Sequence, residues 1–309
     1  MTDAVEVRRA RAEDREAVVA FTADTWPDRG AGDYIQHVFD DWIAGDGDDQ
    51  RTFVLDVEGE VAGICQGVLL SPTEAWAQGM RVNPDFRGRG VSVDLTRAVF
   101  DWAAAAGATV CRNMVFSWNV AGLGQSRAAG FEPETEFRWV HPEPDVDATP
   151  DHGDHRVVAD ADAAWTYWTD SPAREHLHGL GLDPDESWAL SEVTRERLRR
   201  AADDGGLFAV QGGDDGGTRA MAYRSRTYER PNEAGEAETW AEYGVGAWAT
   251  HDHARALFAA VAADAAALGA DRTRVLVPET VEAVSDAAYA RVAVSDEPDF
   301  VLAADLTTR

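Results

Sequence analysis

The most constraining feature of this chain is the stretch Met80–Ser92, which reads Met-Arg-Val-Asn-Pro-Asp-Phe-Arg-Gly-Arg-Gly-Val-Ser. The strand predicted over 74–82 must end at Pro84, because proline lacks an N–H and has a fixed φ. Gly88 and Gly90 permit positive φ and close backbone approach. The helix predicted to follow begins with free N–H groups and the positive end of its dipole. A strand, an Arg/Gly loop and a helix N-terminus together indicate an anion site, most naturally for a phosphate or pyrophosphate.

The spacing of this loop excludes two common phosphate motifs. It lacks the Gly-Lys-Ser/Thr ending of a P-loop and the Gly-x-Gly-x-x-Gly of a Rossmann fingerprint. The pattern Arg87-x-x-Gly90-x-Ser92 resembles the pyrophosphate loop of the GNAT superfamily of acyl-CoA-dependent N-acyltransferases, Gln/Arg-x-x-Gly-x-Gly/Ala. Ser92 departs from the last position, although it is small and can donate its hydroxyl to a phosphate. The alternative interpretation is an ordinary surface turn rich in arginine and glycine. The elements predicted around the loop decide between this turn and an anion-binding loop.

The elements predicted around the loop follow the order of a GNAT domain. Asn119, ahead of Gly130-Phe131, also resembles the segment that follows the fifth strand of that family. Hydrophobic periodicity and turn residues predict strands over 5–10, 52–57, 61–70, 74–82, 109–118 and 135–140, and helices over 11–21, 34–43, 91–106 and 122–129. The resemblance therefore covers the whole first half of the chain.

The second half repeats this order after a linker over 143–154 that is rich in Pro, Asp and Gly. Strands are predicted over 207–211, 219–228, 239–250, 274–277 and 300–305, and helices around Trp165 and Trp168 and over 185–201, 254–268 and 281–291. We therefore expect an α/β (α+β) protein with two tandem GNAT-like domains, 1–142 and 155–309. Each is expected to have a mixed central sheet flanked by helices.

The second domain is expected to be degenerate. Its segment Ala249-Thr-His-Asp-His-Ala has neither glycine nor arginine, and Asp252 would repel a phosphate. His251 and His253 fit a helix cap with exposed histidines better than a metal site. We expect no bound metal.

Composition narrows the classes of function. The chain has 56 acidic residues against 28 basic ones, all of them arginine, for a formal net charge of −28. The acid is spread along the chain, which resembles proteins of salt-in halophiles, notably haloarchaea, whose carboxylate surface stays soluble where salt screens charge. No basic patch points to nucleic acid. No apolar run approaches the ~20 residues that span a bilayer, and no signal peptide is evident, so we expect a cytoplasmic protein.

The two cysteines, Cys65 and Cys111, lie inside predicted strands. Without a CxxC motif or a His/Cys cluster, we expect buried free thiols rather than a disulfide or a metal site.

The resemblance implies an acetyl-CoA-dependent N-acetyltransferase that acts on a primary amine. The backbone of the loop would hold the pyrophosphate, with charge-assisted bonds from its arginines. The edge of the strand that precedes the loop would pair with the pantetheine arm, and a backbone N–H near Met80 would polarise the thioester carbonyl. The residues implied in acetyl-CoA binding are Met80, Arg81, Val82, Arg87, Gly88, Arg89, Gly90, Val91, Ser92 and Asn119.

The proton steps are carried over from the family in the same way. Glu74 is the carboxylate on the strand face that it shares with Gln78 and Met80, so it is the candidate base. A solvated residue at the strand start is the alternative. The family's usual acid is a tyrosine, and Ser126 occupies that position here. Because serine is a poor acid for a thiolate, water supplies the proton, or the chain is a non-catalytic acyl-CoA-binding sensor or scaffold.

Four aromatic residues lie where the resemblance places the acceptor amine. Aromatic rings can line an amine pocket through cation–π contacts. Core packing is the alternative for them. They are Trp26, Tyr34, Phe39 and Trp42.

Overall fold

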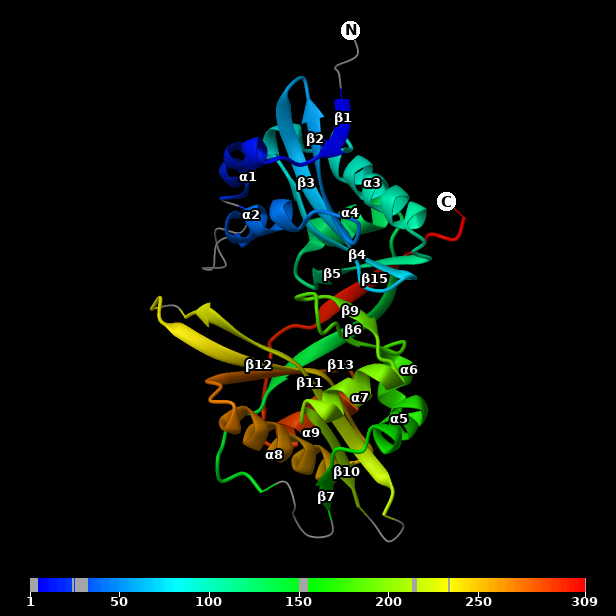
Figure 1. Ribbon diagram of the computed structural model, residues 1–309, viewed down its shortest axis with the longest axis vertical. Coiled ribbons are helices and arrows are strands. Elements are labelled where there is room, and N and C mark those ends of the chain that lie inside the picture. The colour runs from blue at the N-terminus through cyan, green and yellow to red at the C-terminus, as the bar shows by residue number, and fades with distance from the viewer. Residues whose placement is uncertain are drawn as a thin grey trace. The chain divides into compact units, whose positions relative to one another are not determined.

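The computed structural model describes residues 5–23, 25, 33–149, 155–212, 216–232 and 234–308. The chain divides into two compact units. Unit 1 comprises residues 1–115, 119–133 and 301–309, and unit 2 comprises 116–118 and 134–300. Each unit has a mixed β-sheet with helices packed on it (Figure 1). The α/β class expected from the sequence is confirmed.

In unit 1 the strand order is β1-β2-β3-β4-β5-β15, antiparallel from β1 to β4 and parallel between β4 and β5. Helices α1 and α2 cover one face of this sheet and α3 covers the other (Figure 1). The strands are β1 (Val5–Arg9), β2 (Gln50–Val57), β3 (Glu60–Leu69), β4 (Glu74–Val82), β5 (Val110–Phe116) and β15 (Asp299–Asp305). The helices are α1 (Arg15–Thr22), α2 (Ile35–Gly45), α3 (Val91–Ala105) and α4 (Val120–Ala129), with short 3-10 turns at η1 (Ala12–Asp14) and η3 (Pro84–Phe86).

The core of unit 1 follows from the periodicity of its helices and strands. Ile35 and Phe39, one turn apart on α2, are fully buried and join Val18 of α1. They pack against Val54 and Ile64, which point to the same face of β2 and β3. Phe39 is therefore a core residue rather than part of an acceptor site.

Unit 2 repeats the pattern, with the order β7-β10-β11-β12-β13-β6 and a parallel pair only between β12 and β13. The strands are β6 (Glu132–His141), β7 (Arg156–Val158), β10 (Leu207–Gln211), β11 (Thr218–Pro231), β12 (Ala237–Trp248) and β13 (Arg272–Pro278), with β14 (Ala293–Val294) beside β6. The helices are α5 (Ala161–Asp170), α6 (Pro172–His176), α7 (Arg195–Asp203), α8 (His251–Ala267) and α9 (Val281–Tyr289). A separate two-stranded sheet joins β8 (Leu180–Leu182) and β9 (Leu190–Glu192).

The two units exchange their last strands. From Glu134 onward β6 belongs to unit 2, where Val140 is in register with Val275 of β13. Residues 301–309 belong to unit 1, where the Leu306 N–H donates to the Thr109 carbonyl at 2.9 Å. The predicted domains 1–142 and 155–309 are continuous in sequence, whereas each unit takes a strand from the other half. Residues 150–154 of the predicted linker lie outside the described residues.

The helix predicted over 185–201 is wrong in its first half. That segment instead contains β9, which pairs with β8. Trp188 has φ +64°, which no helix accommodates, and the helix begins only after Thr194, whose Oγ1 accepts from the Arg197 N–H at 3.1 Å. Among the described helices, none is both long and apolar enough to cross a membrane.

We expect Asp299 of unit 2 to make stability depend on pH. Its carboxyl is 6% exposed and accepts from Trp139 Nε1–H at 3.0 Å, and burial raises its pKa to about 6. An unfolded Asp has a pKa of about 3.9. The folded state therefore keeps a proton that the unfolded state releases, so this residue lowers stability as pH rises from about 4 to about 6.

Asp299→Asn removes this ionisation while keeping an acceptor for Trp139. The variant should match wild type near pH 4 and exceed it near pH 7 by about 1–3 kcal/mol in unfolding free energy. Denaturant unfolding of both proteins across this range measures the difference. A difference that stays constant with pH would contradict the assignment.

Candidate functional site

Strands β4 and β5 of unit 1 run in parallel and then part. Their register pairs extend only from Glu74↔Val110 to Trp76↔Arg112, although β4 continues to Val82. Beyond Trp76, β4 pairs with β3 on one edge and with no described residue of β5 on the other. An unpaired strand edge presents backbone N–H and C=O groups to an extended ligand.

A β-bulge lies on this parted segment of β4. Strand β3 pairs Ile64 with Arg81 and Gln66 with Gln78, so β4 has one residue more than β3 over the same length. Gly79 within the bulge has φ +66°, and a Cβ there would lie 2.3 Å from the Trp42 ring. Only glycine fits this position. A bulge redirects the backbone that follows it, here at Met80.

The loop between β4 and α3 contains two glycines whose backbone dihedral angles lie in the left-handed region. Gly88 has φ +75° and Gly90 φ +84°, and a Cβ at either would have nothing within 4 Å. Gly90 is the N-cap of α3 and offers no side chain to its free N–H groups. Within the described part of the chain, no acceptor is found for the backbone N–H groups of Gly88, Gly90, Val91 and Ser92. An open loop of unpaired N–H groups at the start of a fifteen-residue helix suits an anion.

The three arginines near the loop differ in their environment. Arg81 is in a bidentate ion pair with buried Asp33, at 2.6 and 3.3 Å, so its charge is compensated at the start of α2. Arg87 and Arg89 are exposed, and neither is in an ion pair with another described residue. The Arg89 guanidinium lies over the Phe86 ring at 5.1 Å. The positive charge of the loop therefore comes from Arg87 and Arg89.

Glu74 lies at the start of β4, where β4 and β5 are still paired. Its Oε1 accepts from Arg112 Nη1 at 2.9 Å, and its Oε2 accepts from the Ser71 hydroxyl at 3.1 Å. Unit 2 has a comparable buried ion pair between Glu242 and Arg274, which are register partners on β12 and β13, whereas the register partner of Arg112 is Trp76. Unit 2 lacks the glycine loop, so the repeated pair fits a role in the sheet.

Ser126 and Asn119 lie on α4. The Asn119 Oδ1 accepts from the Gly122 N–H at 3.0 Å and caps this helix. Ser126 is 1% exposed, and its Oγ accepts from Asn113 Nδ2 at 2.9 Å. Asn113 is the first residue of β5 beyond the paired segment, and its buried Oδ1 has no hydrogen-bond partner in the described structure.

Sequence reasoning missed Asn113. The signal that could have found it is a polar residue inside the strand Val-Cys-Arg-Asn-Met-Val-Phe.

The aromatic residues expected at the acceptor site lie in different environments. Tyr34 is 42% exposed, lies at 5.4 Å from the Arg81 guanidinium and makes an edge contact with Trp42. Trp42 packs on Gly79 of the bulge. Trp26 lies outside the described residues.

The corresponding loop of unit 2 is much shorter. Only Ala249 and Thr250 separate β12 from α8, where unit 1 has residues 83–90. The Thr250 Oγ1 contacts His253 Nδ1 at 2.7 Å, and the His251 ring lies against Tyr289. The described residues contain no cluster of three or more ligands suited to a metal ion. Cys65 and Cys111 are buried and form no disulfide with each other.

Comparisons with known proteins agree with this geometry. Residues 15–124 match the acetyltransferase (GNAT) family. A GCN5-related N-acetyltransferase from Sphaerobacter thermophilus is 15% identical, with a TM-score of 0.61 over 98% of this chain and 96% of that one. A candidate acetyltransferase from Pyrococcus horikoshii is 12% identical, with a TM-score of 0.52 over 97% and 89%.

At these identities the two structures establish the fold, and they do so along nearly the whole chain. The expected mixed α/β fold of the GNAT type is thereby confirmed. No curated protein sequence matches the chain. The sequence similarity to the GNAT acetyltransferase family extends over residues 15–124.

Proposed function

We propose that unit 1 transfers the acetyl group of acetyl-CoA to a primary amine of an acceptor. The observation that carries this proposal is the parting of β4 from β5 immediately before an open glycine loop at the N-terminus of α3. These features supply a strand edge for an extended arm and a cradle for a pyrophosphate within one unit.

Each part of the cleft has a role in this proposal. The N–H groups of Gly88, Gly90, Val91 and Ser92 bind the pyrophosphate, and Arg87 and Arg89 add charge-assisted bonds. The β4 edge at Met80, Arg81 and Val82 pairs with the pantetheine arm. The N–H that follows the bulge donates to the thioester carbonyl and stabilises the oxyanion. Asn119 holds the start of α4 beside the cleft.

The chemistry is a direct transfer. Acetyl-CoA supplies an activated thioester, the amine nitrogen forms a bond to its carbonyl carbon, and the C–S bond breaks. The nitrogen loses one proton and the thiolate gains one, so the products are an amide and a thiol. We assign Glu74 to the ion pair that holds the closed end of the cleft, because Glu242 and Arg274 repeat it where no loop exists. Water then carries both protons.

The alternative function is acyl-CoA binding without turnover. It is favoured by one observation, the burial of the Ser126 hydroxyl in its bond with Asn113, which leaves it unsuited to protonate a thiolate. Release of free CoA in the presence of a panel of primary amines supports the enzyme. Binding of acetyl-CoA with no CoA release by any amine supports the sensor.

Gly90→Glu should abolish acetyl-CoA binding. The side chain would enter the open space at the N-terminus of α3 and place a carboxylate where the pyrophosphate binds. Calorimetry in ~2 M KCl, which screens the acidic surface, should show a loss of about 100-fold or more in affinity.

Gly59→Glu is the matched control. Gly59 also has positive φ and open space around it, but it lies in the β2–β3 turn. This variant should bind acetyl-CoA like wild type. If Gly90→Glu, still folded, bound equally well, the cofactor would lie elsewhere. If wild type did not bind, both proposed functions would fail.

A further inference from the structure

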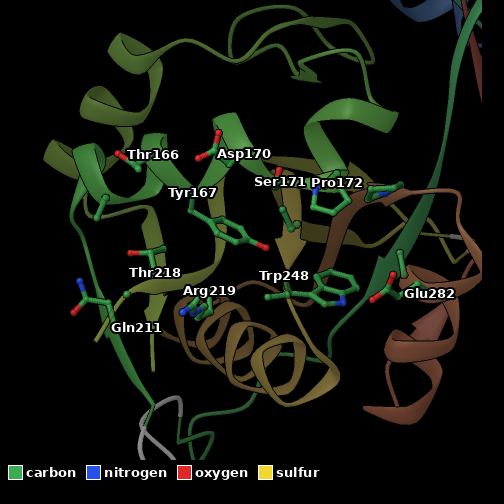
Figure 2. Close-up of a pocket in the computed structure, with 18 of the residues that line it drawn as sticks. Thr166, Tyr167, Asp170, Ser171, Pro172, Gln211, Thr218, Arg219, Trp248 and Glu282 are labelled. Atoms are coloured by element: carbon green, nitrogen blue, oxygen red, sulfur yellow. The ribbon is translucent and has the colours of Figure 1, made fainter. Parts of the chain in front are cut away.

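A cavity of about 770 Å³ opens in unit 2 beyond the point where β12 and β13 part. The two strands are paired up to Tyr243↔Val275, and the cavity is lined by their further ends at Trp248 and Pro278. Its remaining walls come from α5, from β10 and β11 and from the start of α9 (Figure 2). The position corresponds to that of the acetyl-CoA cleft in unit 1. The short link after β12 offers no cradle for a pyrophosphate.

Two hydroxyl groups in the wall of this cavity are buried without a hydrogen-bond partner. The described residues provide none for Tyr167 Oη or Thr218 Oγ1. Figure 2 shows the Tyr167 ring reaching from α5 into the cavity, with Trp248 across from it. Burial raises the pKa of the Tyr167 hydroxyl, so it stays neutral and can donate or accept. Buried polar groups are rarely left unpaired, and a ligand that bonds to the Tyr167 hydroxyl, which points toward Trp248 in Figure 2, would remove its part of this cost.

The charges around the cavity indicate the kind of ligand. Asp170, at the end of α5, and Glu282, in the first turn of α9, are exposed carboxylates that line it. Neither is in an ion pair with a described residue. Arg219 is the basic residue of the lining and already has interactions within the protein. The cavity thus combines two carboxylates and two hydroxyls with the ring of Trp248, a set that suits an ammonium group.

We propose that this cavity of unit 2 binds a small organic cation with a primary ammonium group and does not acetylate it. The ammonium donates to the Tyr167 hydroxyl, and the carboxylates of Asp170 and Glu282 attract it by their charge. Trp248 packs against the organic part. The binding site is independent of the loop in unit 1, so it can be tested whether or not unit 1 binds acetyl-CoA.

The test uses the full chain and three probes of similar size, phenethylamine, 2-phenylethanol and phenylacetate, in the same KCl buffer. Calorimetry should show phenethylamine binding at least about tenfold more tightly than the neutral alcohol, as expected for charge-assisted bonds. Equal affinity for all three probes would overturn the proposal. Tighter binding of phenylacetate would also overturn it, because Arg219 would then govern the site.

Two sets of variants locate the binding. Tyr167→Phe keeps the ring and removes a hydroxyl that bonds to nothing described, so its Tm should not fall, while the Kd for phenethylamine should rise about three- to tenfold. The double variant Asp170→Asn/Glu282→Gln should raise the Kd about two- to fivefold, because the two carboxylates are exposed and the salt screens them. Tyr289→Phe and Glu229→Gln, exposed residues outside the cavity, are the matched controls and should change neither value. Binding that survives every cavity variant would place the amine elsewhere and overturn the proposal.

Discussion

Replacing Glu242 by glutamine should lower the free energy of unfolding by about 3–5 kcal/mol, the cost of leaving a buried charge without its partner. The carboxylate is 1% exposed and is shared by Arg274 and by Arg226, whose Nε donates to Oε2 at 2.7 Å. The Arg274 guanidinium also lies over the rings of Trp139 and Trp188, at 4.3 and 3.9 Å from their centroids. Arg274 is 4% exposed, so the variant would leave this buried cation without the carboxylate to which it is hydrogen-bonded.

Urea unfolding in KCl measures this loss. The matched control is Glu238→Gln on the same strand, where the carboxylate pairs with the exposed Arg272 at 3.1 Å. Exposed ion pairs contribute little, so the control should stay close to wild type. Similar losses of unfolding free energy in the two variants would mean that the buried ion pair stabilises the fold no more than the exposed one.

Gly79→Ala should destabilise unit 1 and weaken acetyl-CoA binding. The residue has φ +66°, a region that costs an L-residue about 1–2 kcal/mol. The added methyl group would also lie 2.3 Å from the Trp42 ring, and overpacking of this kind costs about 1–3 kcal/mol more. We expect a total loss of about 2–5 kcal/mol, with a shift of the backbone at Met80.

Gly59→Ala separates the two causes. Gly59 has φ +92° but no atom within 4 Å of a built Cβ, so only the backbone cost applies. Its loss, measured by the same urea unfolding, should be about 1 kcal/mol. If both alanine variants lost the same free energy, the contact with Trp42 would not restrict the bulge. If Gly79→Ala bound acetyl-CoA normally, the bulge would not position the thioester.

Local signals made most of the fold predictable. Pro84 ends a strand wherever it occurs, and Gly88 and Gly90 adopt the positive φ that their spacing in the loop suggests. The helix period was recognisable where a helix of unit 1 buries one face, as α2 does through Ile35 and Phe39. The acetyl-CoA contacts themselves stay predictions, since they depend on a ligand.

Contacts between distant residues could not be predicted from the sequence. Nothing local indicates that Glu74 meets Arg112 or that Arg81 meets Asp33, because each pair forms only when the sheet and α2 assemble. The same holds for β9, which pairs with β8 although its segment also fits a helical period; the positive φ of Trp188 excludes that helix. The pairing of β15 with β5 could not be predicted either, because neither segment has a sequence feature that indicates its partner strand.

That exchange has a consequence for synthesis of the chain on the ribosome. The β5 edge near Thr109 waits for the segment that ends with Leu306, which is made long after β5 itself. At ordinary elongation rates this takes roughly 10–40 s. Through that time the nascent first half carries an unpaired strand edge, which is open to other chains. A protein shortened after residue 142 would keep that edge permanently, so aggregation is the expected fate of such a fragment.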